Sequence, residues 1–301
     1  MELRSLEYFL AVAEELSFTR AAAKCRISQP TISASIQALE RELGEPLFDR
    51  LPRGISLSPG GEVLVPHARQ CLAAAAVITS EFSARAGLVS GELRLGTVSG
   101  IERTFVPDLL GTFHQKFPGV DVMLTEATSA PLLDRVIRGG LDAAIIARPL
   151  SALPPTISTA TLLRDQLLAV FDPAAVALPP GPVALDELQG HPIISYAPDS
   201  GLRAVLDDAF TRAGLLLHVA YVANDVRLQL AMAAQRVGVA VCAGSDPSLS
   251  DALGLSVRTI APTIGFEKIL VWRNDSTPRA PLRAFLALWT RMRTQSEKRD
   301  D

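Results

Sequence analysis

Short polar side chains open one predicted helix. Ser28 supplies an N-cap oxygen, and Pro30 stands in the first turn, where a missing N–H costs nothing. Apolar residues recur on one face at helical spacing: Ile32, Ile36, Leu39 and Leu43. The opposite face begins with hydrogen-bonding residues: Gln29, Thr31, Ser33 and Ser35. These side chains are too short to block entry into a groove, so this face is suited to hydrogen bonding inside one.

A second set of polar residues stands where other helices are predicted to begin: Ser99–Gly100, Thr128–Ser129 and Ser200–Gly201. Free N–H groups and the positive end of the helix dipole make such positions acceptors for a carboxylate or a phosphate. Arg148, just after a predicted strand, adds a full positive charge. The pattern favours an anionic ligand, although simple N-capping is the alternative use of each serine.

Patterns for catalysis or metal binding are weak. Gly96–Gly100 follows a strand, but its spacing differs from that of a G-x-S-x-G nucleophile elbow. The histidines lack the acidic neighbours of a triad or a metal site: His67, His114, His191 and His218. The cysteines are too far apart for a zinc knuckle or a disulfide framework: Cys25, Cys71 and Cys242. We expect no catalytic residue, no metal and no cofactor.

The elements that must position these residues differ between the two ends of the chain. Residues 1–58 predict three helices followed by a short hairpin, which together make a winged helix-turn-helix. Residues 59–90 predict a long apolar helix that ends at the linker Gly87–Gly91. A helix of roughly 28 residues is well above the globular average, so we expect it to pair with a second copy of itself.

From residue 91 onward, short apolar strands alternate with amphipathic helices, as in an α/β sheet. Residues 91–301 predict a two-lobed domain. Lobe I spans about 91–161 and 266–301, and lobe II spans about 162–265. Predicted strands lie at 93–97, 120–126, 142–147, 162–171, 192–196, 217–222, 237–242 and 266–272, and predicted helices at 103–117, 130–139, 202–213, 225–235 and 279–293.

Composition excludes several classes of protein. The 301 residues are 48% hydrophobic and 20% charged, a globular composition rather than a disordered one. The chain lacks an amino-terminal apolar stretch and a long uncharged apolar segment, so we expect a cytoplasmic protein without a membrane partner. Net charge is -3, and residues 1–58 hold seven Lys/Arg against eight Asp/Glu. Nucleic-acid binding therefore has to depend on where the cations lie.

The segment Leu6–Gly61 resembles the LysR family of bacterial transcription factors. Six family motifs occur in order: Ser17-Phe18-Thr19, Arg20-Ala21-Ala22, Ser28-Gln29-Pro30, Leu39-Glu40-Arg41-Glu42-Leu43-Gly44, Leu47-Phe48-Asp49-Arg50 and Leu57-Ser58-Pro59-Gly60-Gly61. Weaker similarity continues through Phe117-Pro118 and Arg148-Pro149, so the resemblance covers the whole chain.

The resemblance implies that the helix from Ser28 enters the major groove of double-stranded DNA. Gln29 and Pro30 would face bases, with Thr31 and Ser33 beside them, and Arg53 would reach the minor groove. Suitable phosphate contacts are Ser17, Thr19, Arg20 and Arg50. An ion pair with Glu40 or Asp49 is the alternative for Arg50. Family members usually have arginine where this chain has Ala34.

The resemblance also implies a periplasmic-binding-protein-like effector domain, with a ligand in the cleft between its lobes. It would bring the anion-accepting residues together there, for a small carboxylate or other anionic metabolite. The expected assembly is a homodimer or homotetramer on an inverted-repeat promoter site, and RNA polymerase is a candidate protein partner. The alternatives are a two-lobed small-molecule-binding protein or an enzyme without DNA-linked regulation.

Overall fold

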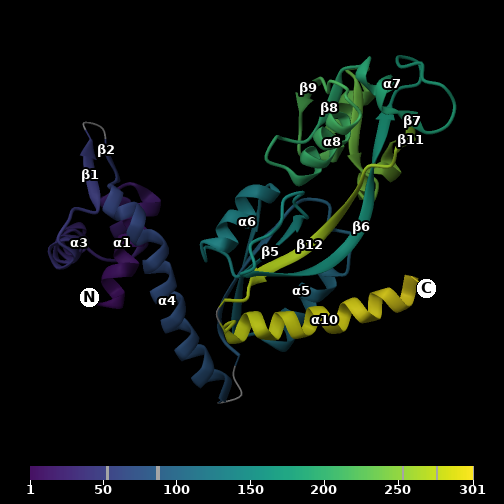
Figure 1. The fold of residues 1–301 in the computed structure, drawn as a ribbon. Coiled ribbons are helices and arrows are strands. Elements are labelled where there is room, and N and C mark those ends of the chain that lie inside the picture. The colour runs from purple at the N-terminus through teal and green to yellow at the C-terminus, as the bar shows by residue number, and fades with distance from the viewer. Residues whose placement is uncertain (52–53, 86–88, 253, 276, 301) are drawn as a thin grey trace. The chain divides into compact units, whose positions relative to one another are not determined.

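The computed structural model describes residues 1–51, 54–85, 89–252, 254–275 and 277–300. These residues form two compact units, the first built mainly from residues 1–88 and the second mainly from residues 89–301 (Figure 1). None of the helices in these ranges combines the length and the apolar character that a membrane crossing requires.

The first unit has the predicted winged helix-turn-helix, followed by one long helix. Its elements are α1 (Leu3–Glu15), α2 (Phe18–Lys24), α3 (Gln29–Leu43), β1 (Phe48–Leu51), β2 (Gly54–Leu57) and α4 (Pro59–Arg85). Strands β1 and β2 pair antiparallel, with Phe48 opposite Leu57 and Leu51 opposite Gly54. The predicted long helix is confirmed, and it continues through Pro66.

Local signals define α3. Ser28 caps its first turn, and Gly44 ends it in the left-handed conformation at φ 83°. Ile32, Ile36 and Leu39 are at most 1% exposed within a core that α1, α2 and the hairpin complete. Leu43 was predicted in the same stripe but is 43% exposed, because the last turn of α3 extends beyond this core.

The second unit alternates strands and helices. Its first part contains β3 (Gly91–Thr97), α5 (Val106–Lys116), β4 (Val120–Glu126), α6 (Ser129–Ile137), β5 (Ala143–Ala147) and β6 (Ile157–Phe171). There follow β7 (Val183–Ala184), α7 (Leu185–Gln189), β8 (Ile193–Ser195), α8 (Gly201–Arg212), β9 (Val219–Val222), α9 (Val226–Ala234), β10 (Val239–Ala243), the 3₁₀ turn η1 (Pro247–Asp251), β11 (Ser256–Ala261), β12 (Gly265–Arg273) and α10 (Ala280–Asp300).

One path of paired strands runs through both lobes of this unit in the order β4-β3-β5-β12-β6-β10-β8-β9. Strand β6 begins at Ile157, about five residues before the predicted start. Its first part pairs with β12, and from Leu167 onward it pairs with β10 and β11. A single long strand therefore belongs to the sheets of both lobes, as its length across Figure 1 shows.

Each lobe has its own buried core. In the first lobe, Phe285 and Trp289 of α10 pack with Phe113 of α5 and with strand β3, so the last helix returns to the first lobe as predicted. In the second lobe, β6, β8 and β10 are covered by α8 and α9. A further buried cluster packs α6 against β5 and β12. The loops at the carboxyl ends of β3, β4 and β5 lie close to the start of α8.

Candidate DNA interface and ligand cavity

The amino-terminal turn of α3 presents its side chains to solvent. The Ser28 Oγ accepts a hydrogen bond from the Thr31 backbone N–H at 3.3 Å and lies 2.7 Å from the Thr31 Oγ1. Gln29, Pro30 and Thr31 are exposed, and Ser33 is half-buried. Because the opposite face of the helix is buried in the core, these residues form the outward edge of α3.

The following residues on this face are less available for contacts. Ser35 Oγ lies 3.2 Å from Ser5 Oγ, so it makes a hydrogen bond within the unit. Ala34, at the position where the family usually has arginine, is exposed. Of the DNA contacts predicted on α3, the exposed ones therefore lie in its first turn.

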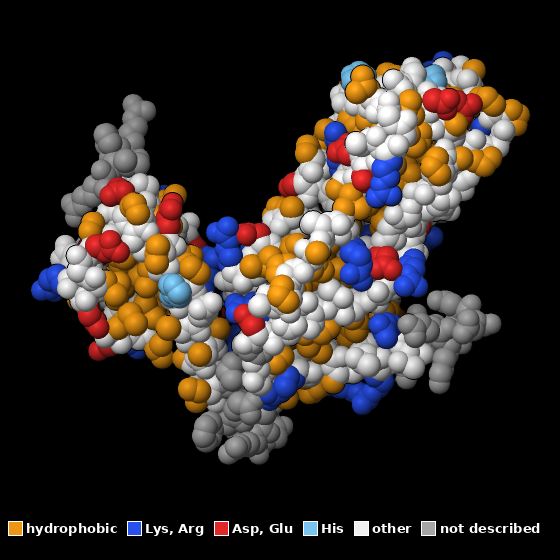
Figure 2. Space-filling view, viewed as in Figure 1, with side chains coloured by type: hydrophobic (Ala, Val, Ile, Leu, Met, Phe, Trp, Pro, Cys, Tyr) orange, Lys and Arg blue, Asp and Glu red, His pale blue; other side chains and the backbone are white. Residues whose placement is uncertain are grey.

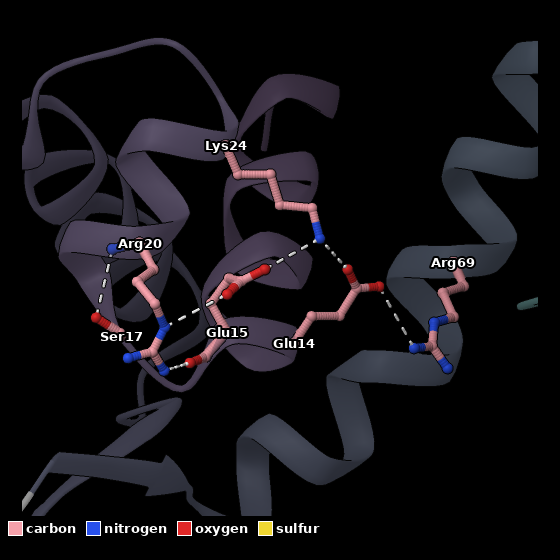
Figure 3. Close-up of polar contacts among 6 residues, drawn as sticks. All are labelled: Glu14, Glu15, Ser17, Arg20, Lys24 and Arg69. Atoms are coloured by element: carbon pink, nitrogen blue, oxygen red, sulfur yellow. Dashed lines mark hydrogen bonds and ion pairs between the residues drawn. The ribbon is translucent and has the colours of Figure 1, made fainter.

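Acidic side chains surround the predicted phosphate contact Arg20 (Figure 3). The Arg20 Nε lies 3.4 Å from the Glu15 carboxylate, and its guanidinium also donates to the Glu15 backbone carbonyl. Lys24 Nζ lies 2.9 Å from Glu14 and 3.4 Å from Glu15, and Arg69 of α4 lies 3.9 Å from Glu14. The hydrogen bond that Lys24 donates to Glu14 is the main reason that the pKa of Lys24 is raised.

These ion pairs lie at the surface, so they leave Arg20 available for the predicted phosphate contact. The Arg20 side chain is 65% exposed, and ion pairs of this kind contribute about 0 to 1 kcal/mol. A DNA phosphate can therefore compete with Glu15 for Arg20. Ser17 is half-buried and caps α2 through the Arg20 backbone N–H at 3.4 Å, whereas Thr19 is exposed.

The predicted wing contacts lie outside the described residues, Arg53 entirely and Arg50 in its side chain. On the face of the first unit drawn in Figure 2, acidic side chains lie among the basic ones. This agrees with the near balance of charges in residues 1–58, and it leaves hydrogen bonding from α3 as the main recognition feature that the described residues offer.

In the second unit, a cavity of about 210 Å³ lies where β3, β4 and β5 end and where α6 and α8 begin. Four predicted ligand-binding residues line it: Ser99, Thr128, Ser129 and Ser200. The other lining residues are Val98, Glu126, Ala127, Ala147, Tyr196, Leu202, Asn224 and Lys268. The fold thus brings two helix starts, at α6 and α8, to one place. The prediction that Ser99–Gly100 begins a helix is wrong, because this segment is a loop after β3 and α5 begins only at Val106.

The two predicted glycines lie beside this cavity. Gly100 lines an adjoining cavity of about 470 Å³ and has φ 73°, which favours glycine. Gly201 lines another of about 540 Å³. A Cβ on Gly201 would lie 2.7 Å from the Ala147 Cβ, so only glycine allows α8 to approach β5 this closely.

Lys268 is the cation of the 210 Å³ cavity. It is 2% exposed, and its Nζ donates hydrogen bonds to the carbonyl oxygens of Ser99 at 3.0 Å and Gly100 at 2.6 Å. Burial lowers its pKa from the ordinary value, an effect opposed by Asp246, Asp165 and Glu102. No carboxylate lies within ion-pair distance of Lys268 in the described ranges, so its hydrogen-bond partners there are carbonyl oxygens rather than an anion.

Hydroxyl groups complete the polar lining. Tyr196 is 3% exposed, and its hydroxyl oxygen accepts the Ala243 N–H at 3.0 Å. Burial raises the pKa of Tyr196 well above its ordinary value, so the hydroxyl keeps its proton. Ser129 Oγ accepts the Ala147 N–H at 3.2 Å, and Ser200 Oγ caps α8. Each of these hydroxyl groups can still donate a hydrogen bond to an anionic ligand.

Arg148 is not brought into this cavity. Its Nε lies 2.6 Å from a Glu267 oxygen, and the other oxygen of Glu267 lies 2.7 Å from Arg164. Hydrogen bonds from both arginines lower the pKa of Glu267, and the one from Arg164 has the larger effect. Strand β12 runs antiparallel to β5 and so places Glu267 beside Arg148, a pairing that spans 119 positions of sequence. The cation that lines this cavity is Lys268, and Arg148 is absent from its lining.

Sequence reasoning missed Lys268, Tyr196, Glu126 and Asn224. A usable signal existed for Lys268, because it and Glu267 are the two charged residues of the otherwise apolar predicted strand 266–272. A lysine in a buried strand is rarely retained without a partner or a function. Glu126 ends β4, and Tyr196 and Asn224 stand shortly after β8 and β9, so none of the three shows a distinguishing pattern.

Comparisons with known proteins agree with this architecture. The family described as "Bacterial regulatory helix-turn-helix protein, lysR family" matches residues 3–62, and "LysR substrate binding domain" matches residues 86–293. The regulator IlvR of Caulobacter vibrioides is 31% identical over 280 residues, which cover 91% of this chain and 93% of IlvR. The dual regulator OxyR of Escherichia coli is 37% identical over 147 residues, 49% of this chain and 48% of OxyR.

Solved structures share the fold over nearly the whole length. A full-length OxyR variant from Pseudomonas aeruginosa has a TM-score of 0.72 and 26% identity, covering 96% of this chain and 93% of its own. CbnR in complex with its target DNA has a TM-score of 0.62 at 22% identity, and the match covers 97% of this chain and 99% of CbnR. These relatives are transcriptional regulators and not enzymes. The chain therefore belongs to the LysR family of DNA-binding transcriptional regulators, with an amino-terminal helix-turn-helix and a two-lobed effector-binding domain.

Proposed function

We propose that this regulator binds an inverted-repeat promoter site as a homodimer or homotetramer, and that a small carboxylate in the 210 Å³ cavity switches its effect on transcription. The observation that carries the effector proposal is Lys268, a buried cation without a carboxylate at ion-pair distance among the described residues. Burying an unpaired charge is unfavourable, and a bound carboxylate would supply the missing partner.

The hydroxyls of the cavity support the same ligand class. Thr128, Ser129 and Ser200 stand at or next to the starts of α6 and α8, Ser99 lies in the loop after β3, and Tyr196 adds a buried phenol. The Thr128 hydroxyl is not available to donate to a ligand, because its Oγ1 already donates a hydrogen bond to Asp199 at 2.6 Å. The remaining hydroxyls and Lys268 together provide donors for both oxygens of a carboxylate.

For DNA recognition, we assign base contacts to Gln29 and Pro30, with Thr31 and Ser33 at the groove edge. Gln29 is exposed at the first turn of α3, and glutamine pairs bidentately with adenine in the major groove. Phosphate contacts are assigned to Ser17, Thr19, Arg20 and Arg50, and Arg53 is proposed for the minor groove.

Self-association is proposed to involve α4. Five exposed residues follow one face of this helix at spacings of three or four: Val63, His67, Cys71, Ala74 and Ile78. Val63 is 64% exposed and Ile78 is 62% exposed. Apolar side chains gather on the face of the first unit drawn in Figure 2. Pairing of two such helices would bury this stripe and set the spacing of two DNA-binding heads.

The switch requires different effector affinities for two conformations. Strands β6 and β12 run through the unit that contains the cavity, so a ligand that draws the lobes together would alter the geometry at these strands. We propose that this change reaches DNA through the dimer arrangement in the cytoplasm, with RNA polymerase as a candidate partner.

The test combines DNA binding and ligand response in the full-length protein. Footprinting on the DNA upstream of its own gene should protect two half-sites with two-fold symmetry, and sedimentation should give a dimer or tetramer. A carboxylate that stabilises the protein should also change the footprint. Protection of a single half-site by a monomer would contradict the proposed assembly, and carboxylate binding without any change in DNA binding would contradict the switch.

A further inference from the structure

Acidic side chains concentrate beside the cavity that holds Lys268. The adjoining 470 Å³ cavity shares Ser99, Glu126 and Asn224 with it. Four carboxylates line the two spaces: Glu102, Glu126, Asp225 and Asp246. The lining cations are Lys268 and Arg227. The combined lining therefore has more negative than positive charge, which disfavours a ligand that carries negative charge alone.

Two of these carboxylates have local partners. Asp225 caps α9 and lies 2.8 Å from Arg227, so this pair is self-contained. Asp246 accepts the Ser248 N–H at 3.0 Å and is the largest charge opposing the lowered pKa of Lys268. Asp246 partly offsets the charge of Lys268. The exposed carboxylates of Glu102 and Glu126 have no hydrogen bond or ion pair with another described residue.

Glu126 is the most informative of the four. It ends β4 and lines both spaces, including the one with Lys268 and Tyr196. Lys268 and Tyr196 are each at least 97% buried, and the Tyr196 hydroxyl proton has no acceptor in the described part of the chain. One cavity thus has a buried donor group at one side and a free carboxylate at another.

We propose that the effector is a small zwitterion of the α-amino acid class, with its carboxylate at Lys268 and Tyr196 and its ammonium group at Glu126. This inference rests on the proposed carboxylate effector and specifies it further. Glu126 would accept hydrogen bonds from the ammonium group, and Glu102 and Asp246 would add a favourable potential.

The size and apolar lining of the cavity agree with this class. A cavity of about 150 Å³ holds benzene, so a space of about 210 Å³ accommodates a molecule a few atoms larger. Val98, Ala127, Ala147 and Leu202 provide an apolar surface for a short aliphatic body.

The test uses calorimetry and thermal shift on the full-length protein. The probes are the standard L-α-amino acids, each compared with the carboxylic acid that lacks the amino group and the amine that lacks the carboxyl group. At least one amino acid should bind, and its matched acid and amine should each bind about 10-fold to 100-fold more weakly, as expected for the loss of hydrogen bonds to a charged group.

Two variants locate the effect. Glu126→Gln should weaken binding of the amino acid by about 10-fold or more, and it should leave binding of the matched acid unchanged or strengthen it. Asp121→Asn removes an exposed carboxylate from the same strand, outside both spaces, and should change neither. If the matched acid binds as tightly as the amino acid, or if Glu126→Gln has no effect, the proposal of a zwitterionic effector is wrong. The proposal of a carboxylate effector is then unaffected. If no amino acid binds, this inference is likewise overturned, and binding of a carboxylic acid would show that the proposed function survives it.

Discussion

The first unit and the ligand cavity use positive charge in opposite ways. Arg20 and Lys24 lie at the surface within 3.4 Å of glutamate carboxylates, whereas Lys268 is 2% exposed and hydrogen-bonds to two carbonyl oxygens. Surface pairs form and break at little cost, so Arg20 can exchange Glu15 for a DNA phosphate. A buried cation without a carboxylate partner is costly to the fold, which makes it a marker of ligand binding.

Removal of the buried cation tests this contrast most strongly. Lys268→Met should weaken effector binding by about 2 to 5 kcal/mol, because a carboxylate then enters the cavity without its partner. The free energy of unfolding of the ligand-free protein should stay unchanged or rise, since an apolar side chain of similar length avoids the cost of burying a charge. Calorimetry and chemical denaturation measure the two quantities.

Lys116→Met is the control for this variant, because Lys116 is an exposed lysine at the end of α5. It should alter neither quantity. Unchanged effector affinity in Lys268→Met would remove Lys268 from the site, and a marked loss of stability would assign it a structural function.

Truncation of Gln29 tests the exposed hydrogen-bonding edge of α3. Gln29→Ala should reduce discrimination between specific and random DNA by roughly 1 to 3 kcal/mol, because a base contact is lost. Fluorescence anisotropy at fixed salt on both DNAs measures this difference. Gln37→Ala, an exposed glutamine farther along α3, should keep full discrimination. Equal loss on both DNAs in Gln29→Ala would exclude Gln29 from base readout.

Arg148 is a partly exposed cation of the second unit, and its removal should have a smaller effect. Its side chain is 40% exposed and paired with Glu267, so Arg148→Ala should cost about 1 kcal/mol of stability or less and leave effector binding intact. A loss of the effector response in a reporter assay would instead return Arg148 to the ligand site.

The pH dependence of this cost has a definite sign. The folded-state pKa of Glu267 is lowered, so its stabilisation is present above the unfolded-state pKa and is lost as pH falls through the folded-state pKa. The stability difference between wild type and Arg148→Ala should therefore be present at pH 7 and disappear in acid. A difference that persists below pH of about 2, well under the ordinary glutamate pKa, would contradict the ion-pair explanation.

The smallest expected effect is at the surface network of the first unit. Glu15→Gln releases Arg20 from its carboxylate partner, so affinity for any DNA sequence should rise by a few-fold at most, about 0 to 1 kcal/mol. Titration at several salt concentrations should show a slope steeper by about 1 or less. Unchanged affinity and slope would indicate that Arg20 does not contact phosphate.

Much of the first unit could be predicted from its sequence. The Ser28 cap, the Gly44 stop and the buried stripe Ile32, Ile36 and Leu39 depend on hydrogen bonds and side-chain positions within a few turns of one helix. The spacing of Leu43 was equally regular, yet Leu43 is exposed, because only packing decides where a core ends. The helix starts at Ser129 and Gly201 were also visible locally, whereas the one expected at Ser99 is a loop, because α5 begins only at Val106. Ser99, Thr128, Ser129 and Ser200 nevertheless line the cavity.

Strand pairing determined the charges at the ligand site, and no local pattern specifies it. Glu267 and Lys268 are neighbours on β12, where alternation directs one toward Arg148 and the other toward the carbonyls of Ser99 and Gly100. These contacts span 119 and about 168 positions of sequence. Helical periodicity and capping act over a few residues, whereas the register of two distant strands depends on the whole folded sheet, so the cation of the cavity became evident only in three dimensions.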